Sequence, residues 1–387
     1  MNIGLSLLTI RPGMVGGAET YVQELLKVLP AAGDVDRVAV FGNSEVVAAY
    51  QQRSRTNGFD LRPVSGMEAG KGSLRRALGL GSALLAPTRI WGNRYSDLDM
   101  IHFPVAVGLP EPKLTWAVTL HDVAHHAVAD LFSRADRAYR AVAYDRAARR
   151  ADLVITVSEH AKGQIVDYLG VAPEKVIAIP LGIDHERFVP NPTDADADAA
   201  SLKQFELPER YIYYPANMWN HKNHIRLIEA FGRVPDKDLH LVLTGQTYGR
   251  EAELHSAIAE AGASGRVRHI GYVPASAIPA LYRGSLALVF PSLFEGFGIP
   301  PLEAMACGIP VAASNSGSLG EVLANCALGF SPTDVESITD AISVITSDEH
   351  QRQRLVKAGI SRAQEFTWSQ SAARHINAYR DLIESGR

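Results

Sequence analysis

Short continuous apolar runs alternate with segments that carry apolar residues at helical spacing along the first half of the chain. Such a run is typical of a buried strand, and the longer spaced pattern is typical of a helix with one buried side. Regular alternation of strands and helices predicts a parallel sheet with helices on both faces. The strands expected in this half are 2–10, 38–41, 100–103, 117–120, 153–157 and 176–179, with helices at 18–29 and 135–150.

The second half repeats this alternation after an interruption. Residues 190–207 are rich in Pro, Asn, Ala and Asp and show no apolar period, so they indicate a boundary between two domains. We expect an N-terminal domain over 1–188, a linker over 189–207 and a C-terminal domain over 208–368. The strands expected after the boundary are 211–214, 239–245, 267–274, 286–290 and 309–313, with helices at 225–233, at 275–282 and by pattern from 334 to 387.

The stretch 290–311 reads as strand, loop, short helix and strand. Pro300 and Pro301 suit the first turn of a helix, where a missing amide hydrogen costs no hydrogen bond. Gly308 is placed to end that helix in the left-handed conformation. The pattern therefore predicts a loop and a helix N-terminus at the carboxyl end of a strand, which is where open α/β sheets bind ligands.

Two carboxylates flank this loop. Glu295 lies within it, and Glu303 is expected in the first helical turn, where the helix dipole favours negative charge. Carboxylates can accept hydrogen bonds from the vicinal hydroxyls of a hexose or a ribose. The backbone at Gly296 and Gly298 can approach a ligand closely, and a helix N-terminus suits a phosphate. The combination predicts a nucleotide-sugar site, whereas each glutamate alone is also explained by capping or by an ordinary surface loop.

A second polar loop follows the strand expected at 211–214. Asn220 is expected to cap the next helix, which places Lys222 at the positive end of that helix. A diphosphate is multiply charged and needs a cation in a partly dry site. Lys222 is therefore predicted to neutralise the diphosphate of the donor.

Gly16 and Gly17 precede the first expected helix, so free amides there can face a crevice. The same turn also serves as a plain tight connection. The G-x-G-x-x-G spacing of a dinucleotide site is absent, which disfavours a nicotinamide oxidoreductase.

Histidines follow the strand expected at 117–120. The His121 imidazole can donate to or accept from a sugar hydroxyl or a phosphate. Together with Asp122, His125 and His126 it raises a metal site as an alternative, but the spacing matches no common zinc pattern. We expect His125 and His126 to be loop residues near an acceptor.

Composition narrows the class of protein. The 387 residues are 47% hydrophobic and 21% charged, typical of a globular protein, and a net charge of −4 gives no basic excess for nucleic acid. Two cysteines form no disulfide framework, and no leader or spanning helix is evident, so a cytoplasmic protein is expected. Residues 70–94 are basic and amphipathic. They suit a peripheral membrane contact on the inner face, an acceptor-side helix or a plain covering helix.

The segment from Glu295 to Glu303 resembles the Glu-x7-Glu signature of the retaining glycosyltransferases of family 4, and Met305 to Val311 continues the match. This resemblance implies a GT-B fold, an α/β architecture with two doubly wound Rossmann-like domains facing across a cleft. It also implies that a C-terminal helix at about 369–387 packs back on the first domain. The implied reaction moves a hexosyl group from a nucleoside diphosphate sugar to a hydroxyl, with retention of configuration.

The resemblance also implies roles for single residues. Lys222 should neutralise the diphosphate, Glu295 should hold the hexose, and Glu303 should hold the ribose hydroxyls. A catalytic role is implied for His121, Lys222 and Glu295. Donor binding is implied for Gly16, Gly17, Asn217, Lys222, Gly245, Val273, Glu295, Phe297, Gly298, Ile299 and Glu303. No metal and no other cofactor is expected.

One position departs from the family. Ala216 stands where the family often has a phosphate-binding arginine, and Asn217 or Arg226 is expected to compensate in part. The sequence from Trp219 to His224 is similar to a mannosyltransferase-like subgroup that acts in bacterial polysaccharide synthesis. GDP-mannose is therefore the favoured donor, a UDP-sugar is an alternative, and the acceptor is a saccharide or a lipid-linked saccharide. A nucleotide-sugar epimerase and a non-catalytic glycan-binding protein remain as alternatives.

Overall fold

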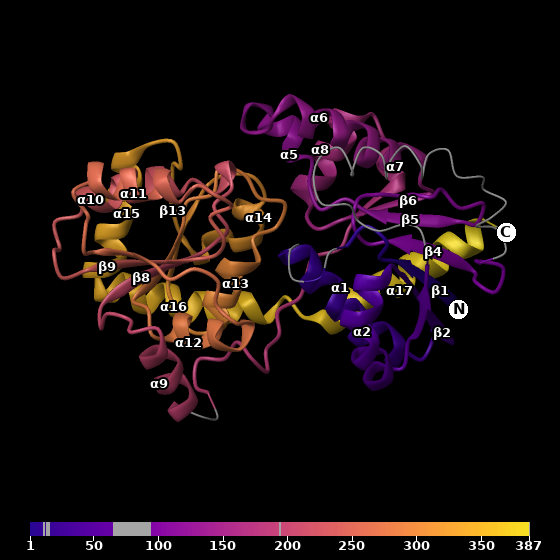
Figure 1. The fold of residues 1–387 in the computed structure, drawn as a ribbon, viewed down its shortest axis with the longest axis horizontal. Helices are drawn as coiled ribbons and strands as arrows, with labels where there is room; N and C mark the ends of the chain where they lie inside the picture. Colours follow the sequence, from indigo (N-terminus) through magenta and orange to yellow (C-terminus); the bar gives the residue numbers. More distant parts are fainter. Residues whose placement is uncertain (11, 13–15, 65–93, 193–194, 387) are drawn as a thin grey trace. The chain divides into compact units, whose positions relative to one another are not determined.

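The computed structural model describes residues 1–10, 12, 16–64, 94–192 and 195–386. Contacts between these residues divide the chain into two units. The first unit comprises Met1–Gly182 together with Trp368–Arg387, and the second comprises Ile183–Thr367. Each unit contains its own parallel β-sheet, and Figure 1 shows helices covering these sheets.

In the first unit, the described strands form one parallel sheet in the order β3-β2-β1-β4-β5-β6-β7. The order runs in opposite directions on the two sides of β1, as in a doubly wound sheet. The strands are β1 (Asn2–Ser6), β2 (Arg37–Gly42), β3 (Asp60–Pro63), β4 (Met100–Phe103), β5 (Trp116–Thr119), β6 (Leu153–Thr156) and β7 (Val176–Ala178). The helices are α1 (Gly17–Val28), η1 (Leu29–Ala31), α2 (Ser44–Asn57), α5 (Ala124–Ala127), η2 (Ala129–Leu131), α6 (Arg134–Arg140), η3 (Ala141–Asp145), α7 (Arg146–Arg150), α8 (Glu159–Leu169), η4 (Pro173–Lys175) and α17 (Trp368–Ser385).

The second unit repeats this winding in the order β10-β9-β8-β11-β12-β13, so its direction changes between β8 and β11. The strands are β8 (Tyr211–Pro215), β9 (His240–Thr244), β10 (Val267–His269), β11 (Ala287–Phe290), β12 (Val311–Ser314) and β13 (Leu328–Phe330). The helices are α9 (Ala195–Gln204), η5 (Asn220–Lys222), α10 (His224–Arg233), α11 (Glu251–Glu260), η6 (Ala275–Ala277), α12 (Ile278–Arg283), α13 (Ile299–Ala306), α14 (Leu319–Leu323), η7 (Ala324–Cys326), α15 (Val335–Ser347) and α16 (Glu349–Gln364).

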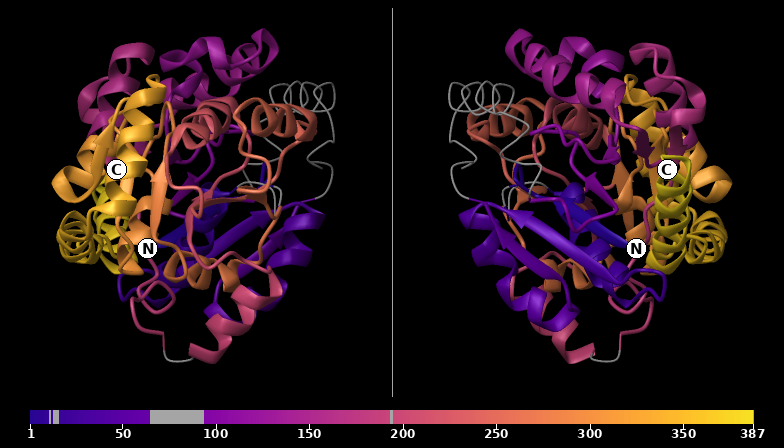
Figure 2. Two further views of the ribbon diagram at one scale, coloured as in Figure 1. Left: turned by 90° about the vertical axis from the view of Figure 1, so that its left-hand side faces the viewer. Right: turned by 90° about the vertical axis from the view of Figure 1, so that its right-hand side faces the viewer.

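The C-terminal helix α17 belongs to the first unit, where it packs against α1 (Figure 1 and Figure 2). The segment 189–207, which was predicted to be a linker, falls inside the second unit and contains α9. Asp198 on α9 accepts two hydrogen bonds from the Arg283 guanidinium, at 2.5 and 2.7 Å. An alanine-rich helix with one ion pair shows little apolar periodicity, which explains why the sequence pattern missed it.

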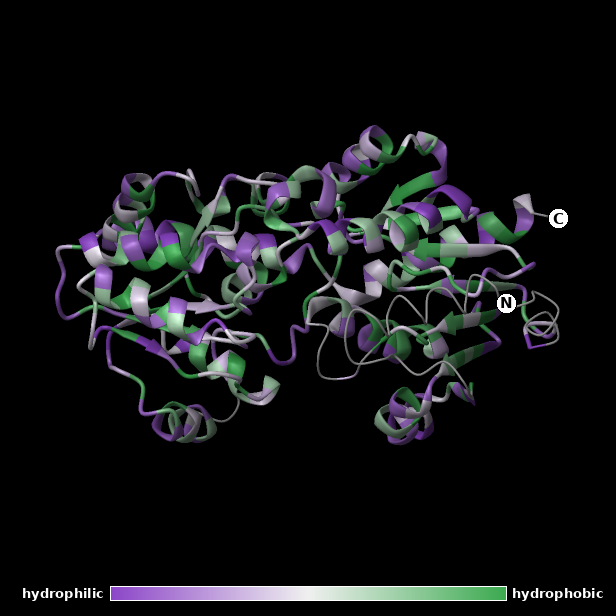
Figure 3. Cartoon of the chain, turned by 45° about the horizontal axis from the view of Figure 1, so that its top comes forward, coloured by the Kyte–Doolittle hydropathy of each residue, from purple (hydrophilic) through white to green (hydrophobic). Residues whose placement is uncertain are grey.

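The strands account for most of the core. The inner strands of both sheets are buried at nearly every position, and Figure 3 shows that the strands are largely hydrophobic whereas the helices carry both polar and apolar residues. The strand expected at 267–274 was predicted too long, because it ends at His269 and Gly271 follows with a φ of 72°. The helix expected at 135–150 contains the π-helical turn η3.

The basic segment 70–94 lies outside the described residues except for Arg94, so the membrane-contact prediction stays a prediction. None of the helices in the described part of the chain combines the length and the apolar character that a membrane-spanning helix requires.

Candidate functional site

The strands β8 and β11 pair side by side where the second sheet changes direction, and the loops that leave them carry the main candidate residues. Lys222 ends the 3-10 turn η5 after β8, and Glu295 lies in the loop after β11. The Lys222 Nζ atom lies 2.6 Å from Glu295 Oε1, and the side chains are only 19% and 13% exposed. The sequence placed these two residues at one site, and the structure brings them into direct contact.

The backbone of Glu295 is fixed from behind by the loop that follows β12. Its carbonyl oxygen accepts hydrogen bonds from the Ser318 amide at 3.1 Å and from Ser318 Oγ at 3.0 Å. Gly317 has a φ of 64°, and a Cβ there would lie 2.7 Å from the Glu295 oxygen. Only glycine allows so close an approach, so this loop fixes the backbone of Glu295.

The helix α13 begins as its sequence predicts. Gly298 precedes it with a φ of 96°, and a Cβ at this position would lie 2.5 Å from Leu319 Cδ2. Pro300 and Pro301 occupy the first turn. Gly308 follows the helix with a φ of 75°, and its amide donates to the Met305 carbonyl at 3.0 Å. Both ends of this helix are therefore determined by backbone conformations that the local residues favour.

The prediction that Glu303 lies in the first turn of that helix was wrong. The helix begins at Ile299, so Glu303 is one turn further along and does not benefit from the free amides of the first turn. Burial raises the pKa of Glu303 to about 7, although the Tyr282 hydroxyl donates to its Oε2 atom at 3.0 Å and Arg187 opposes the shift. A carboxyl group in this state gains most from a ligand that brings hydrogen-bond donors.

The expected capping role of Asn220 was also wrong. Asn220 begins the turn η5, and Asn223 precedes α10 in the left-handed conformation with a φ of 63°. Asn223 Nδ2 donates to the carbonyls of Pro291 at 3.0 Å and Pro332 at 2.8 Å. Asn223 thus ties together the loops after β8, β11 and β13, a role that sequence reasoning missed. Its only sequence signal is an asparagine, the residue that best tolerates this conformation after glycine.

Asn217 and Arg226, which were expected to compensate in part for the arginine missing at position 216, both make hydrogen bonds within the second unit. The Asn217 side chain accepts from the Gln246 amide at 2.8 Å. Arg226 Nη1 donates to Asn223 Oδ1 at 2.8 Å. A different cation, Arg250, reaches this edge from the loop after β9 and donates to the Met218 carbonyl at 2.8 Å.

The electrostatic surroundings of His224 show that Arg250 and Lys222 act on the same region. Burial lowers the pKa of His224 to about 4, a hydrogen bond to the Ala216 carbonyl opposes the shift, and the charges of Lys222 and Arg250 lower the value further. Arg250 also forms an ion pair with Glu253 at 2.7 Å. Two cations therefore lie at this edge, each neutralised by its own carboxylate.

The other donor-site residues predicted for the second unit are placed as follows. Gly245 has a φ of 120°, and a Cβ there would lie 2.5 Å from the Ala216 oxygen, so Gly245 lets two loops touch. Val273 is buried, and the Phe297 side chain packs edge-on to Phe366 with ring centroids 5.7 Å apart. Of Val273 and Phe297, the backbone is therefore the part that remains for a ligand.

In the first unit, Gly16 precedes α1 with a φ of 61° and a ψ of −131°, and Gly17 is the first residue of that helix. His121 follows β5, and burial lowers the pKa of its imidazole to about 4, opposed by Asp122 and by a hydrogen bond to the Pro104 carbonyl. His121 Nε2 is buried without a partner among the described residues. The lowered pKa keeps this imidazole neutral near pH 7, so one of its two ring nitrogens carries a lone pair.

A buried polar network lies behind His121, whose ring meets Tyr21 edge-on with centroids 5.2 Å apart. The His375 Nδ1–H group donates to the Ser371 carbonyl, which makes His375 Nε2 an acceptor for the Tyr21 hydroxyl at 2.7 Å. The Tyr21 oxygen then accepts from Thr119, which in turn accepts from His102 Nε2–H. The Tyr379 hydroxyl completes the network by donating to His102 Nδ1 at 2.8 Å.

The metal alternative raised by the sequence falls on a different set of residues. The structure separates His125 and His126 from His121 and places them against Asp145, with ligand-type atoms within 4.8 Å of one another. His125 is buried rather than an open loop residue, because α5 folds its ring inward. Both imidazoles hydrogen-bond to the Asp145 carboxylate, which satisfies this charge within the protein.

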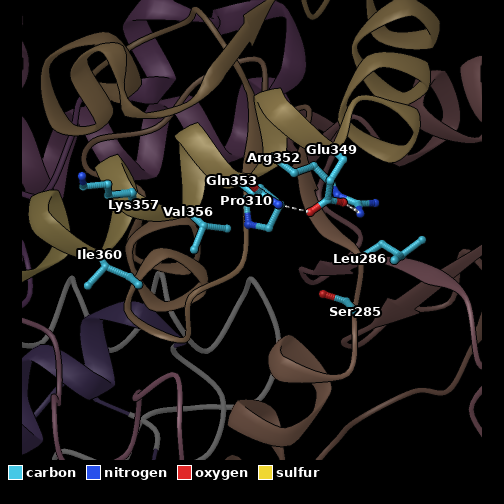
Figure 4. A pocket seen from close by; sticks show the side chains of 9 residues that line it. All are labelled: Ser285, Leu286, Pro310, Glu349, Arg352, Gln353, Val356, Lys357 and Ile360. Atoms are coloured by element: carbon cyan, nitrogen blue, oxygen red, sulfur yellow. Dashed lines mark hydrogen bonds and ion pairs between the residues drawn. The ribbon is translucent and has the colours of Figure 1, made fainter.

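A pocket of about 500 Å³ lies elsewhere on the second unit. Figure 4 shows that it is lined by Ser285, Leu286 and Pro310 and by side chains of α16 such as Val356 and Lys357. Ser285, Leu286 and Pro310 precede β11 and β12, so this pocket is at the amino ends of the strands. It is on the opposite edge of the sheet from Lys222 and Glu295 and is not the candidate site.

Two family models match the chain. The model described as Glycosyltransferase Family 4 matches residues 15–187, and the model described as Glycosyl transferases group 1 matches residues 199–362. The O-antigen chain mannosyltransferase B of Escherichia coli is 26% identical over 373 residues, which cover 95% of this chain and 96% of that protein. The serotype-specific mannosyltransferase WbdA of Escherichia coli is 30% identical over 245 residues, which cover 62% of this chain but only 30% of that protein.

Solved structures share the fold at lower sequence identity. Sucrose-phosphate synthase from Thermosynechococcus elongatus has a TM-score of 0.79 and 21% identity, and the match covers 100% of each chain. The structure of Anabaena HepE in complex with UDP and glucose has a TM-score of 0.75 and 19% identity over 98% of this chain and 100% of that one. Together with the two parallel sheets, these similarities show a GT-B fold.

Proposed function

Since this chain belongs to the GT-B glycosyltransferases that combine a family 4 domain with a group 1 domain, we propose that it transfers a mannosyl group from GDP-mannose to a saccharide hydroxyl, free or lipid-linked, with retention of configuration. Mannosyltransferases among its relatives support the choice of sugar. The name of the O-antigen chain mannosyltransferase supports an acceptor of the kind used in bacterial polysaccharide synthesis.

The contact of Lys222 with Glu295 at the direction change of the second sheet is the observation that carries this proposal. In the structure, the ammonium group and the carboxylate form an ion pair with each other. A sugar diphosphate offers both groups better partners, because its phosphate oxygens attract the ammonium group and its sugar hydroxyls donate to the carboxylate. The donor would therefore bind between these two side chains, with its diphosphate at Lys222 and its sugar at Glu295, and both side chains are already in position.

Further groups on the same sheet edge fit the other parts of the donor. The cation of Arg250 supplies a second positive charge for the diphosphate, in place of the arginine that is absent at position 216. The N-terminus of α13, with Gly298 and Ile299, offers backbone amides to a phosphate. Glu303 gains donors when ribose hydroxyls bind. These positive groups make a metal ion unnecessary for donor binding.

The chemistry we propose is electrostatic. The acceptor oxygen attacks the anomeric carbon, the bond from that carbon to the phosphate oxygen breaks, and the acceptor proton passes to the departing diphosphate. Lys222 stabilises the negative charge that grows on the leaving group. Glu295 holds the hexose, and attack by Glu295 as a covalent nucleophile is the alternative route to retention.

A donor panel tests this function directly. The purified protein is incubated with GDP-mannose, UDP-glucose or ADP-glucose, each with and without a mannose-terminated acceptor, and the products are followed by mass spectrometry and NMR. We expect an α-mannosyl product from GDP-mannose only when the acceptor is present. Two outcomes would contradict the proposal. One is an epimerised sugar in the arm without acceptor, and the other is turnover of UDP-glucose but not of GDP-mannose.

A further inference from the structure

The segment that begins the second unit presents an exposed arginine on a tight turn. Asp184 Oδ1 accepts hydrogen bonds from the amide of Glu186 at 3.1 Å and from the amide of Arg187 at 3.3 Å. The Asp184 carbonyl accepts from the Arg187 amide at 3.2 Å and from the Phe188 amide at 2.9 Å. An aspartate that bonds the amides just after it stabilises such a turn. The turn therefore fixes the backbone of Arg187, which is exposed, and of Phe188, which is buried.

The Arg187 side chain reaches the part of the chain that follows β10. Its Nη2 atom donates to the Ala275 carbonyl at 2.7 Å, and Ala275 begins η6, just after the loop that leaves the carboxyl end of β10. The guanidinium carbon also lies 5.0 Å from the centroid of the Phe188 ring. A guanidinium group carries five N–H groups, so the bond to Ala275 leaves donors for a ligand. Arg187 is thus a fixed cation close to the edge at which parallel sheets bind ligands.

The same turn connects Arg187 to Glu303, the group proposed to bind the ribose. The Phe188 ring lies edge-on to the Tyr282 ring with centroids 6.1 Å apart, and the Tyr282 hydroxyl donates to Glu303 Oε2 at 3.0 Å. Burial raises the pKa of Glu303, whereas the Tyr282 hydrogen bond and the charge of Arg187 lower it. The charge of Asp184 adds a smaller increase. The guanidinium group therefore lies close enough to the Glu303 carboxylate to act on it electrostatically.

The cations at the proposed diphosphate site act on a different group. Burial lowers the pKa of His224 at the start of α10, and the charges of Lys222 and Arg250 lower it further. Arg187 acts on the proposed ribose group instead. Within the part of the chain that the structure describes, Arg187 is therefore placed for a portion of the donor other than the diphosphate.

The order of groups in a nucleotide leaves the base for Arg187. The diphosphate and the base are attached at opposite ends of the ribose. With the diphosphate at Lys222 and the ribose at Glu303, we expect the base beyond Glu303, within reach of the guanidinium group.

The donors of an arginine match one base better than the others. Guanine presents two acceptors, N7 and O6, side by side, and the planar guanidinium group can donate to both at once. Adenine presents N7 beside an amino group, which is itself a donor. Uracil presents a single acceptor, O4, on the corresponding edge. An arginine at this position therefore favours guanine over adenine and uracil.

We propose that Arg187 is the residue that distinguishes guanine from other bases in the donor, by donating two hydrogen bonds to N7 and O6. This inference rests on the proposed function for the positions of the diphosphate and the ribose. It deepens that function by assigning the base preference to one side chain. Arg187 is a specificity-determining residue and takes no part in breaking or forming bonds.

Binding of GDP, 7-deaza-GDP, UDP and ADP to the full chain, measured by calorimetry without sugar or acceptor, tests the proposal. We expect the wild-type protein to bind GDP at least about tenfold more tightly than UDP or ADP. The analogue 7-deaza-GDP lacks N7 and should bind more weakly than GDP. Arg187→Ala should weaken GDP binding by about tenfold or more and leave UDP binding as in wild type.

The analogue also separates base recognition from plain structural support. In Arg187→Ala, GDP and 7-deaza-GDP should bind equally, because the partner of N7 has been removed. Arg187→Lys keeps the charge without the planar pair of donors, so it should not restore the preference for GDP. Arg233→Ala is the matched control, because this exposed arginine forms its ion pair with Glu229 on the same helix. It should change none of the affinities.

Three results overturn the role of Arg187. These are equal binding of GDP and 7-deaza-GDP by the wild-type protein, a preference of the wild-type protein for UDP, and an equal loss of GDP and UDP binding in Arg187→Ala. The last would assign Arg187 to the ribose or the phosphates. Since these measurements involve no transfer, they are independent of the donor panel. A protein that transfers mannose from GDP-mannose but gives any of these results would refute only the role of Arg187.

Discussion

The carboxyl edges of the two sheets use opposite electrostatics. In the second unit, the edge carries full charges in pairs, with Lys222 against Glu295 and Arg250 against Glu253. In the first unit, burial lowers the pKa values of His121 and of His102 and His375 behind it and keeps these imidazoles neutral, and His121 Nε2 has no partner among the described residues. A charged edge suits a diphosphate, whereas a neutral edge with fixed acceptors suits hydroxyl groups. This difference supports the proposal that the two sheets, although wound in the same way, bind two kinds of ligand.

Burial has opposite consequences for acids and bases, and this explains part of the contrast. It lowers the pKa of His121 to about 4 and so keeps the imidazole neutral, whereas it raises the pKa of Glu303 to about 7. Near neutral pH, the charge of Glu303, a proposed donor-site group, therefore changes readily. The charge at the two edges should therefore depend on pH in different ways.

The largest effect is expected from Lys222→Met, which removes the cation from the charged edge. The leaving diphosphate loses its stabilising charge, so kcat should fall by about 10²- to 10³-fold. Steady-state kinetics with GDP-mannose measure this. Lys203→Met on α9 is the matched control, because it removes an exposed lysine and should leave turnover unchanged.

The stability of this variant needs its own control. Lys222→Met leaves Glu295 partly buried without its partner, so the protein should also lose stability. The double variant Lys222→Met with Glu295→Gln should recover stability but not activity. Full activity of the single variant at saturating donor would show that Lys222 does not act on the phosphates.

The second prediction concerns the pH dependence set by Glu303. Its pKa in the folded protein is about 7, above its value in the unfolded chain, so the folded state binds more protons between about pH 4.5 and 7. Stability should therefore fall as pH rises through this window, by up to about 3 kcal/mol. Thermal unfolding scans from pH 4 to 8 measure the change.

Glu303→Gln should remove this pH dependence and make the ligand-free protein more stable than wild type at pH 8. It should also reduce the thermal shift produced by GDP, because a carboxylate that accepts from two ribose hydroxyls has been lost. A variant with the wild-type pH slope would contradict the assignment of the titration to Glu303. A variant with the wild-type GDP shift would contradict the ribose contact.

The sequence predicted the charged edge better than the neutral one, and the reason is local chemistry. Pro300, Pro301 and Gly308 determine the ends of α13 through their own backbone preferences, so a short stretch suffices to place them. The Glu-x7-Glu spacing then places Glu295 in the loop before this helix and Glu303 within it. The pairing of Lys222 with Glu295 follows once β8 and β11 are neighbours, which the doubly wound order requires.

The features that the sequence did not reveal depend on residues far apart in the chain. Asn223 connects these loops only because the carbonyls of Pro291 and Pro332 lie next to it in space. Asp145 gave no signal because its partners are about twenty residues earlier and its π-helical turn has no pattern in the sequence. Glu303 was predicted to lie one turn too early in the helix. The two prolines indicate a first turn but do not determine that the helix begins at Ile299.

The smallest effect, and the sharpest test of the neutral edge, is expected from Tyr379→Phe. This change removes the hydroxyl that donates to His102 Nδ1 at 2.8 Å and leaves a fully buried lone pair unsatisfied. The free energy of unfolding should fall by about 1–3 kcal/mol, measured by denaturant titration. Tyr272→Phe, at an exposed ring, is the control and should cost nothing measurable. Because the other bonds of the network still fix the tautomers of His102 and His375, kcat should change far less than in Lys222→Met. A loss of activity comparable to that of the lysine variant would mean that protons of this network take part in catalysis, and the edge could no longer be regarded as electrostatically neutral.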